Sequence, residues 1–340
     1  MRKHGEQIVN VEELLAENLG YEGERDYLTG ISEETKQVAS ALAEVAQTSV
    51  FMVAPYLRKA ARSRPDFDLK RSFHDIVTEH DRHVEDLFRS YLAQVVPGSL
   101  VLGEEAGEQL ASRPVISTTV QDAIATLDPQ GVPLVGGLGS RVRFIVDPID
   151  GTANFASGLT HFGSSIGVEL DGQVVAAAVS TPCLREAIVG DAENVWHATE
   201  SGERESVVCA GPEKESEALL VAYYPRRKYM VEDPMRSVEN ELALFEEYSV
   251  VRRPGAGALD LANVAAGWVG ALIGPAFAPW DVAAGIHLIR VAGGHVLNLP
   301  MDTDLPYGLR PCVVASVSTL DAKTAKRIAL EQQLIEDEQV

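Results

Sequence analysis

The sequence is poor in cysteine. Its three cysteines, Cys183, Cys209 and Cys312, are scattered along the chain. They show none of the short spacings that form zinc sites, and an odd number cannot all pair within one chain. Isolated cysteines of this kind are typical of a protein that works in a reducing compartment. We therefore expect a cytoplasmic protein without structural disulfides or zinc.

Long apolar segments are also missing. No apolar run reaches the roughly 18 residues that a membrane-spanning helix needs. The first residues, Met1 to Gly5, are followed by polar residues and not by the apolar core of a secretory signal. We expect no membrane partner and no export signal.

Basic residues are outnumbered. The chain has 29 lysines and arginines against 50 aspartates and glutamates, which gives a formal net charge of −21. Such a chain repels nucleic acids and anionic membranes, so we expect no nucleic-acid partner. An anionic substrate would be repelled too, unless bound cations reversed the sign of the local charge.

The composition is otherwise that of a globular protein. Hydrophobic residues make up 46% of the 340 residues and charged residues 23%. The chain is long enough for a large core, in one domain or two lobes. We expect an irregular acidic extension over 1–31 and a main domain over 32–340, divided into lobes at 32–189 and 190–340. Within the first lobe, 108–140 is a polar insertion with glycine and proline, which suggests a flexible lid or a surface excursion.

Apolar periodicity gives the main elements. A helix begins at Ser32, and Pro55 should kink or split it. A second helix follows Asp81, whose side chain suits an N-cap. Asp171-Gly172 joins two strand-like runs and indicates a β-hairpin. Further helices are expected at 236–247, 255–267, 280–290 and 319–336, and strands at 100–102, 144–146, 164–170, 173–179, 271–273 and 311–315.

The stretch from Asp147 to Phe155, Asp-Pro-Ile-Asp-Gly-Thr-Ala-Asn-Phe, carries the clearest chemical signal. It follows the apolar strand 144–146, so both aspartates lie where a strand ends and a turn begins. Pro148 restricts the backbone on either side of it. Two carboxylates held close together repel and require a proton or a cation between them. Mg²⁺, which takes oxygen ligands, fits this role. The alternative is an ordinary turn, since Asp, Pro and Gly are common turn formers.

Other acids have a similar context. Glu104 follows the short strand at 100–102, Asp281 opens a helix, and Asp81 is a further candidate. Each alone is more often a cap or a turn residue. Together with Asp147 and Asp150 they predict an all-oxygen site for two or three Mg²⁺ ions.

Three motifs carry a family resemblance. Gly103-Glu104-Glu105, the segment 147–155 and Trp280-Asp281-Val282-Ala283-Ala284-Gly285 resemble, in order, the signatures of the inositol monophosphatase family, which belongs to the Mg²⁺-dependent, lithium-sensitive sugar phosphatases. The likeness runs from about Ser32 to Ser316. It implies an α/β (α+β) fold of layered αβαβα type and a homodimer.

The resemblance also implies roles for individual residues. One Mg²⁺ would bind Glu104, Asp147 and the Ile149 carbonyl, a second Asp147, Asp150 and Asp281, and a third, weaker ion would depend on Glu104. Asp81 and Thr152 would orient and deprotonate the attacking water. Substrate contacts would come from Asp150, Gly151, Thr152, Ala256, Gly257 and Lys70, with backbone N–H groups at 151–152 receiving the phosphate.

The chain departs from the family pattern on one side of the site. Family members that act on inositol phosphate usually have a glutamate seven residues before the Trp-Asp aspartate, where it holds substrate hydroxyls. That position is Gly274 here, and the aspartate expected four residues earlier is Gly270. The stretch 274–279 is apolar instead.

The expected function is Mg²⁺-dependent hydrolysis of a small phosphomonoester, with inositol monophosphate as the default substrate. Histidinol phosphate, fructose 1,6-bisphosphate and 3′-phosphoadenosine 5′-phosphate stay open as alternatives. A different class also stays open, a catalytically silent relative that binds a metabolite or a regulatory partner.

Overall fold

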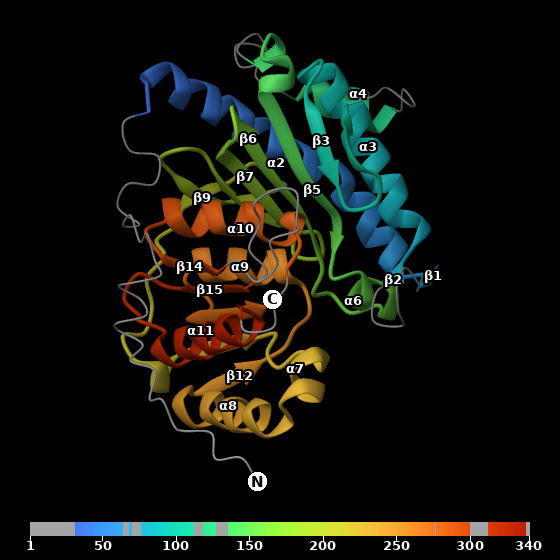
Figure 1. Cartoon of the computed structure of the whole chain (residues 1–340). Helices are drawn as coiled ribbons and strands as arrows, with labels where there is room; N and C mark the ends of the chain where they lie inside the picture. The colour runs from blue at the N-terminus through green and yellow to red at the C-terminus, as the bar shows by residue number, and fades with distance from the viewer. Residues whose placement is uncertain are drawn as a thin grey trace.

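The structure is a computed structural model that describes residues 31–63, 68–69, 76–111, 118–126, 135–275, 277–299 and 312–337. Two large β-sheets alternate with three layers of helices, as Figure 1 shows from top to bottom. This arrangement is the mixed α/β, layered αβαβα fold expected from the sequence.

The first sheet has eight strands in the order β10-β9-β8-β7-β6-β5-β3-β4. All neighbours are antiparallel except β3 and β5, which run parallel. The strands are β3 (Leu100–Gly103), β4 (Gly107–Leu110), β5 (Val142–Asp150), β6 (Gly163–Leu170), β7 (Gln173–Thr181), β8 (Glu186–Gly190), β9 (Val195–Thr199) and β10 (Arg204–Ser206). Asp171 and Gly172 both have positive φ at the β6–β7 turn, so the expected hairpin is confirmed.

The second sheet has five strands in the order β12-β11-β13-β15-β14. They are β11 (Leu219–Ala222), β12 (Val250–Arg252), β13 (Ala271–Pro275), β14 (His295–Leu299) and β15 (Cys312–Ser316). A separate pair joins β1 (Asp68–Leu69) to β2 (Ile76–Val77). The eight-stranded sheet extends to Ser206, whereas the division expected at 189/190 falls inside β8.

Helices cover both faces of each sheet (Figure 1). α2 (Glu33–Ala61), α3 (Glu79–Val95) and α4 (Thr118–Ala125) lie outside the first sheet, and α9 (Gly257–Ala265) and α10 (Pro279–Val291) lie between the sheets. α11 (Lys323–Asp337), α8 (Pro234–Glu247) and the short α7 (Arg227–Glu232) lie beyond the second sheet. The remaining helical segments are α6 (Thr152–Ser157), η2 (Gly139–Arg141) and η3 (Glu215–Glu217).

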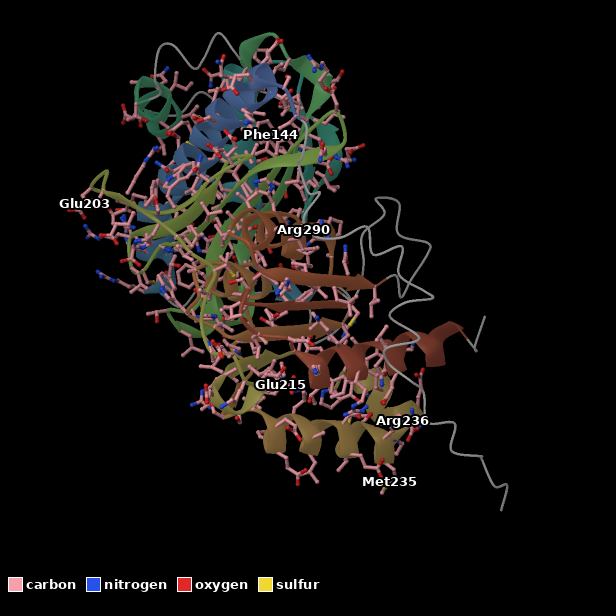
Figure 2. The ribbon with its side chains drawn as sticks, turned by 90° about the vertical axis from the view of Figure 1, so that its left-hand side faces the viewer. Phe144, Glu203, Glu215, Met235, Arg236 and Arg290 are labelled. Carbon is pink, nitrogen blue, oxygen red and sulfur yellow. The ribbon has the colours of Figure 1, made fainter. Side chains whose placement is uncertain are left out.

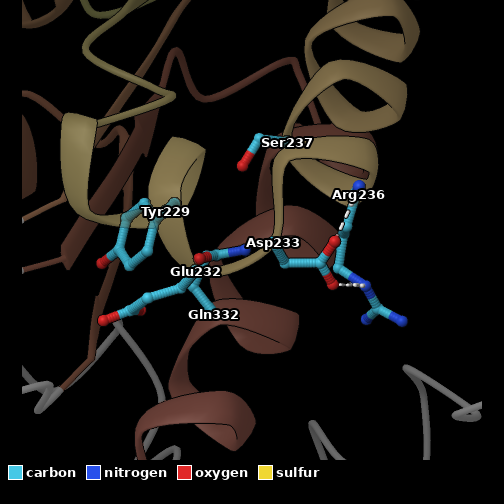
Figure 3. A pocket seen from close by; sticks show the side chains of 6 residues that line it. All are labelled: Tyr229, Glu232, Asp233, Arg236, Ser237 and Gln332. Carbon is cyan, nitrogen blue, oxygen red and sulfur yellow. Dashed lines mark hydrogen bonds and ion pairs between the residues drawn. The ribbon is translucent and has the colours of Figure 1, made fainter.

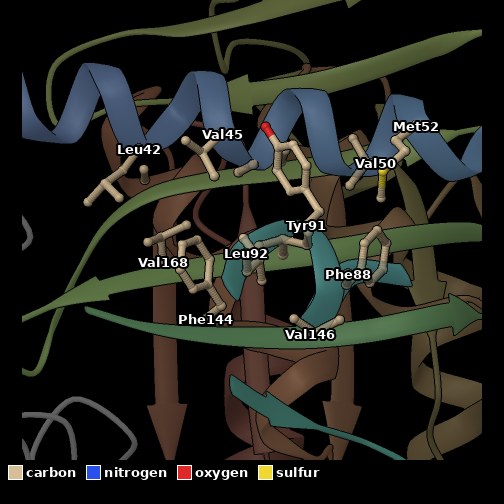
Figure 4. Close-up of a cluster of buried hydrophobic side chains, with 14 of the residues drawn as sticks. Leu42, Val45, Val50, Met52, Phe88, Tyr91, Leu92, Phe144, Val146 and Val168 are labelled. Carbon is tan, nitrogen blue, oxygen red and sulfur yellow. The ribbon is translucent and has the colours of Figure 1, made fainter. Parts of the chain in front are cut away.

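α2 is a core helix. By length and mean hydropathy it could cross a membrane, but 61% of its most apolar window is buried in the protein. It packs on β6, β7 and β8, and Figure 4 shows its side chains meeting those of α3 and the sheet. The cluster includes Leu42, Val45, Val50 and Met52 from α2, Phe88, Tyr91 and Leu92 from α3, and Phe144, Val146 and Val168 from β5 and β6.

Two local expectations need correction. Pro55 does not split α2, which continues to Ala61. Asp81 is not the N-cap of α3. Thr78 holds that position, and Asp81 stands at N3 of a capping box. In the described parts of 108–140, β4 pairs with β3, and α4 packs on α2 and α3 and buries Val120. A role of this insertion as a lid or a surface excursion stays a prediction.

Candidate active site

A β-bulge aims Asp147 and Asp150 the same way. Residues three apart in a regular strand point to opposite faces of a sheet. Here the pairing of β5 with β6 shifts register between the two aspartates, and the Ser164 hydroxyl donates to the Pro148 carbonyl oxygen at 2.7 Å. A bulge of this kind re-aims side chains. Both carboxylates consequently reach one cleft.

Gly151 allows the acidic motif to pack closely against the loop before α9. Its φ of +82° is in the left-handed region, and α6 begins at the next residue. A Cβ at this position would lie 3.0 Å from the Cβ of Ala256 and 3.2 Å from the carbonyl oxygens of Gly255 and His161. Only glycine allows the loop before α9 to come this close to the acidic motif.

Asp281 completes an acidic triplet. It lies in the first turn of α10, where its Oδ2 accepts a hydrogen bond of 2.7 Å from the backbone N–H of Ala278. One carboxylate oxygen from each of Asp147, Asp150 and Asp281 lies within 4.8 Å of the other two. Glu104, just beyond β3, lines the same cleft.

The cleft has a volume of about 250 Å³. The residues lining it come from the ends of β3 and β5, the starts of α6, α9 and α10, and the ends of β11 and β13. They are Glu104, Asp147, Ile149, Asp150, Gly151, Thr152, Ala153, Tyr223, Gly255, Gly257, Phe277 and Asp281. A second hollow, at the junction of α7 and α8 (Figure 3), measures about 10 Å³, room for no more than one water molecule.

The buried carboxyls are electrostatically strained. Burial, followed by the charges of Glu104, Asp150 and Asp281, raises the pKa of Asp147 well above its usual range. Burial raises the pKa of Asp150 to about 8, although hydrogen bonds from the α9 backbone oppose this rise. The Oδ1 atom of Asp147 is buried and has no hydrogen-bond partner. A cation would remove both penalties, so these oxygen donors fit Mg²⁺.

Asp81 and Thr152 lie together beside the triplet. The Thr152 hydroxyl is 3.2 Å from Oδ1 of Asp81 and 2.9 Å from the Ile149 carbonyl oxygen. The other oxygen of Asp81 accepts hydrogen bonds from the N–H and hydroxyl of Thr78, at 2.8 and 2.6 Å. The Asp81 carboxylate is thus fixed in orientation, with Oδ1 directed toward Thr152.

A buried ion pair supports the turn that carries Glu104. Arg89 donates to Glu85 at 2.7 Å and to the Gly107 carbonyl oxygen at 2.9 Å. Glu85 in turn accepts from the backbone N–H of Glu105 at 2.9 Å. A Cβ on Gly103 would lie 2.3 Å from the Glu85 carboxyl carbon, so glycine is required there. Sequence reasoning missed this pair, because its i,i+4 spacing is that of an ordinary surface ion pair.

Sequence reasoning also missed the aromatic residues of the cleft. Tyr223 directly follows β11, and Phe277 lies in the apolar stretch before α10. The Tyr223 hydroxyl donates to Asp260 at 2.5 Å, and His161 Nε2 lies 2.8 Å from the other Asp260 oxygen. The signal for Phe277 was the apolar stretch 274–279, whereas Tyr223 lies in a region where no strand was predicted.

The remaining sequence-derived candidates have mixed outcomes. Gly257 lines the cleft, whereas Ala256 is buried behind it as the N-cap residue of α9. Lys70 lies outside the described residues, so its expected substrate contact stays a prediction. The roles assigned to the acids are likewise predictions, although the cleft brings Glu104, Asp147, Ile149, Asp150 and Asp281 together.

Comparison with known proteins identifies related sequences. A model of the inositol monophosphatase family matches residues 33–333. The inositol-1-monophosphatase SuhB of Mycobacterium tuberculosis is 33% identical over 228 residues, which are 67% of this chain and 70% of that protein. The Nus factor SuhB of Pseudomonas aeruginosa is 31% identical over 222 residues, 65% of this chain and 72% of that protein.

Solved structures share the fold. Mycobacterium tuberculosis SuhB superposes with a TM-score of 0.62 at 27% identity, covering 86% of this chain and 97% of that one. The extragenic suppressor protein SuhB of Bartonella henselae gives a TM-score of 0.63 at 22% identity, covering 88% and 100%. The second of these likenesses concerns the fold alone.

Proposed function

The chain belongs to the inositol monophosphatase family, and on that basis we propose that it is a Mg²⁺-dependent phosphomonoesterase acting on a small phosphorylated metabolite. The observation that carries the proposal is the triplet of Asp147, Asp150 and Asp281, with its unpartnered buried oxygen on Asp147. Relatives named inositol-1-monophosphatase make inositol 1-phosphate the reference substrate. Histidinol phosphate, fructose 1,6-bisphosphate and 3′-phosphoadenosine 5′-phosphate are the alternatives.

Two to three Mg²⁺ ions would be held by Glu104, Asp147, Asp150, Asp281 and the Ile149 carbonyl oxygen. The carbonyl has a second lone pair beside the one that faces Thr152. When bound, such ions lower the pKa of water and neutralise phosphoryl oxygens.

The chain's own residues supply positioning and proton transfer. Asp81 is fixed by Thr78, so its Oδ1 keeps one direction, toward the Thr152 hydroxyl. We assign to this pair the orientation of a water molecule and the acceptance of its proton. Gly151 and Thr152 line the cleft, and we assign to their backbone N–H groups the binding of the phosphate.

Asp147→Asn tests the proposal. The change keeps the shape of the side chain and removes a carboxylate from the centre of the triplet. We expect loss of Mg²⁺-dependent phosphate release from a panel of inositol, sugar, histidinol and nucleotide phosphates. Mg²⁺ affinity should be measured by calorimetry. Loss of a residue that only supports a metal ligand costs about 10–100-fold in affinity, and we expect a larger fall here because a ligand itself is removed. Li⁺ should inhibit the unchanged protein.

A matched control is Asp171→Asn in the β6–β7 turn. Asp171 is exposed and has a positive φ of 54°, a conformation that asparagine tolerates. This variant should keep full activity. Turnover by Asp147→Asn at the rate of this control would refute the mechanism.

A regulatory binding role is the second candidate, because some relatives are named Nus factors. The discriminating measurement is turnover. Mg²⁺ binding without phosphate release from any ester of the panel would favour the regulatory role.

We further propose a homodimer, built on an exposed apolar stripe. Val231 of α7 and Met235, Val238, Leu242 and Phe245 of α8 are each half exposed or more. The α8 members recur at intervals of three and four, and Met235 lies at the outer edge of the molecule in Figure 2. A contiguous apolar face of this kind marks an interaction site.

A second copy of the chain fits the stripe. Two copies of α8 packed antiparallel would cover each other's exposed apolar side chains, because a two-fold dimer pairs the same surface of both copies. Leu242→Glu should therefore give a monomer in light scattering, whereas Leu184→Glu, the same change at another exposed leucine, should not. A monomeric unchanged protein would contradict the proposal.

We also propose a cytoplasmic location. The free cysteines Cys183, Cys209 and Cys312 support it, because free cysteines are typical of a reducing compartment.

A further inference from the structure

Two chemically different groups of residues line the cleft. One group is the acids Glu104, Asp147, Asp150 and Asp281, and the other is the aromatic pair Tyr223 and Phe277. A phosphate bound among cations at the carboxylates would leave the alcohol part of its ester to contact the remaining lining residues.

The ring of Phe277 occupies space that two glycines leave free. A Cβ on Gly274 would lie 1.9 Å from Cε2 of this ring, and a Cβ on Gly257 would lie 2.7 Å from Cε1. Any larger residue at either position would displace the ring. The ring is therefore held between β13 and the start of α9, and Phe277 is itself only 8% exposed.

Tyr223 extends the apolar surface. Its ring packs edge-on against Phe277, with centroids 5.2 Å apart and an interplanar angle of 67°. Such edge-to-face pairs are a favoured aromatic arrangement. The two rings thus form one continuous aromatic wall, defined by Tyr223 and Phe277.

The tyrosine hydroxyl is already bound to the protein. It donates to Oδ2 of Asp260, which is 1% exposed and whose other oxygen contacts His161. Burial and the charge of Asp260 raise the pKa of Tyr223, so the hydroxyl stays protonated and keeps donating. Tyr223 therefore presents its ring to the cleft, while its hydroxyl is occupied by the hydrogen bond to Asp260.

We propose that this wall makes the site selective for phosphomonoesters whose alcohol part presents a planar aromatic or heteroaromatic ring, over esters of polyhydroxylated rings. The inference rests on the proposed phosphatase function. A polyol placed against the wall would lose water from its hydroxyls without gaining partners there, whereas a flat ring gains contacts. Unpaired hydroxyls lower kcat/KM about tenfold or more each.

The test compares 2-phenylethyl phosphate with inositol 1-phosphate and glycerol 2-phosphate, all with saturating Mg²⁺. Phenylethanol is the poorest leaving group of the three alcohols, so intrinsic reactivity works against the expected result. We expect kcat/KM at least about tenfold higher for 2-phenylethyl phosphate than for inositol 1-phosphate.

Two variants separate the ring from its surroundings. Phe277→Leu keeps an apolar side chain and removes the ring, so the preference for the aromatic ester should fall about three- to tenfold, mainly through KM. Tyr223→Phe keeps the ring and removes the hydroxyl, so the preference should persist. The control is Trp268→Leu, which removes an exposed aromatic ring that does not line the cleft and should leave the ratio of the two kcat/KM values unchanged.

The outcomes distinguish the two proposals. Mg²⁺-dependent turnover with equal or higher kcat/KM for inositol 1-phosphate overturns the aromatic selectivity and leaves the phosphatase function standing. A Phe277→Leu variant with unchanged selectivity also overturns it. No turnover of any ester overturns both.

Discussion

The carboxylate of Asp150 accepts a hydrogen bond of 2.8 Å from the backbone N–H of Leu259, in the first turn of α9. Ala256, the N-cap residue of that helix, has no side chain able to cap it. Asp150 therefore caps a helix from a distant part of the chain. The positive end of the helix dipole favours its charge. A predicted metal ligand is thus held in place by a helix that lies between the two sheets.

The thermal stability of the metal-free protein should depend on pH. The pKa of Asp150 is about 8 in the folded protein, against 3.8 for the ordinary group. As the pH rises, the Asp150 carboxyl therefore loses its proton at a lower pH in the unfolded chain than in the folded protein. The stability that the protonated carboxyl provides is complete below about pH 4 and is lost as the pH rises to about 8.

In EDTA, we expect the Tm to fall between about pH 6 and pH 8, and excess Mg²⁺ to offset this fall. Differential scanning calorimetry gives both curves. Asp150→Asn should flatten the curve in EDTA, and Asp171→Asn should not. A Tm in EDTA that rises across this interval would contradict the expected sign.

Asp81→Asn should impair the chemical step and spare the fold. An asparagine oxygen can still accept from the Thr78 N–H, so the start of α3 should hold. It cannot accept a proton from water. We expect kcat to fall about 10²–10⁴-fold, with Mg²⁺ affinity changed far less. A parallel loss of kcat and Mg²⁺ affinity would instead make Asp81 part of the ion site.

Arg89→Met should destabilise the protein. The side chains of Arg89 and Glu85 are 4% and 2% exposed, and removal of one partner leaves a buried charge unpaired. We expect a loss of about 3–5 kcal/mol in urea unfolding. Mg²⁺ affinity should also fall about tenfold, because the turn carrying Glu104 loses its support.

The double variant Glu85→Gln/Arg89→Met should recover much of that stability, since no buried charge is left. Arg141→Met is the comparison. Arg141 pairs with Asp171 on the surface, and its loss should destabilise the protein far less than the loss of Arg89. Equal losses for Arg89→Met and Arg141→Met would show that burial does not matter here.

Gly274→Glu restores the residue that the family resemblance leads one to expect, but the site has no room for it. The new Cβ would lie 1.9 Å from the Phe277 ring. We expect a loss of about 1–3 kcal/mol from overpacking. Gly274→Glu/Phe277→Ala should regain stability and shift kcat/KM toward inositol 1-phosphate. Selectivity that stays unchanged in the double variant would count against the role of Phe277.

Local patterns predicted much of the fold. The β6–β7 hairpin followed from Asp171-Gly172, and the regular spacing of apolar residues located α2 and α3. These features depend on residues close together in the sequence. The acids of the cleft could be grouped because each stands at the end of a strand or the start of a helix.

Contacts between distant segments were beyond that reasoning. The bulge between Asp147 and Asp150 depends on how β6 pairs with β5, and no residue type in the sequence predicts it. The burial of Glu85 and Arg89 depends on β3 and the turn after it. The ring of Phe277 could be placed only when Gly257 and Gly274 were known to face the same space.

The negative charge of the cleft determines the order in which metal ions and the phosphate ester bind. The described residues lining it include four carboxylates and no lysine or arginine. A doubly charged phosphate meets repulsion there until cations have bound. Addition should therefore be sequential, with metal before ester and with inorganic phosphate leaving before the last ion is released. At low Mg²⁺ the apparent KM for the ester would rise steeply. The rate of turnover would then depend on the concentration of free Mg²⁺ as strongly as on the concentration of the ester.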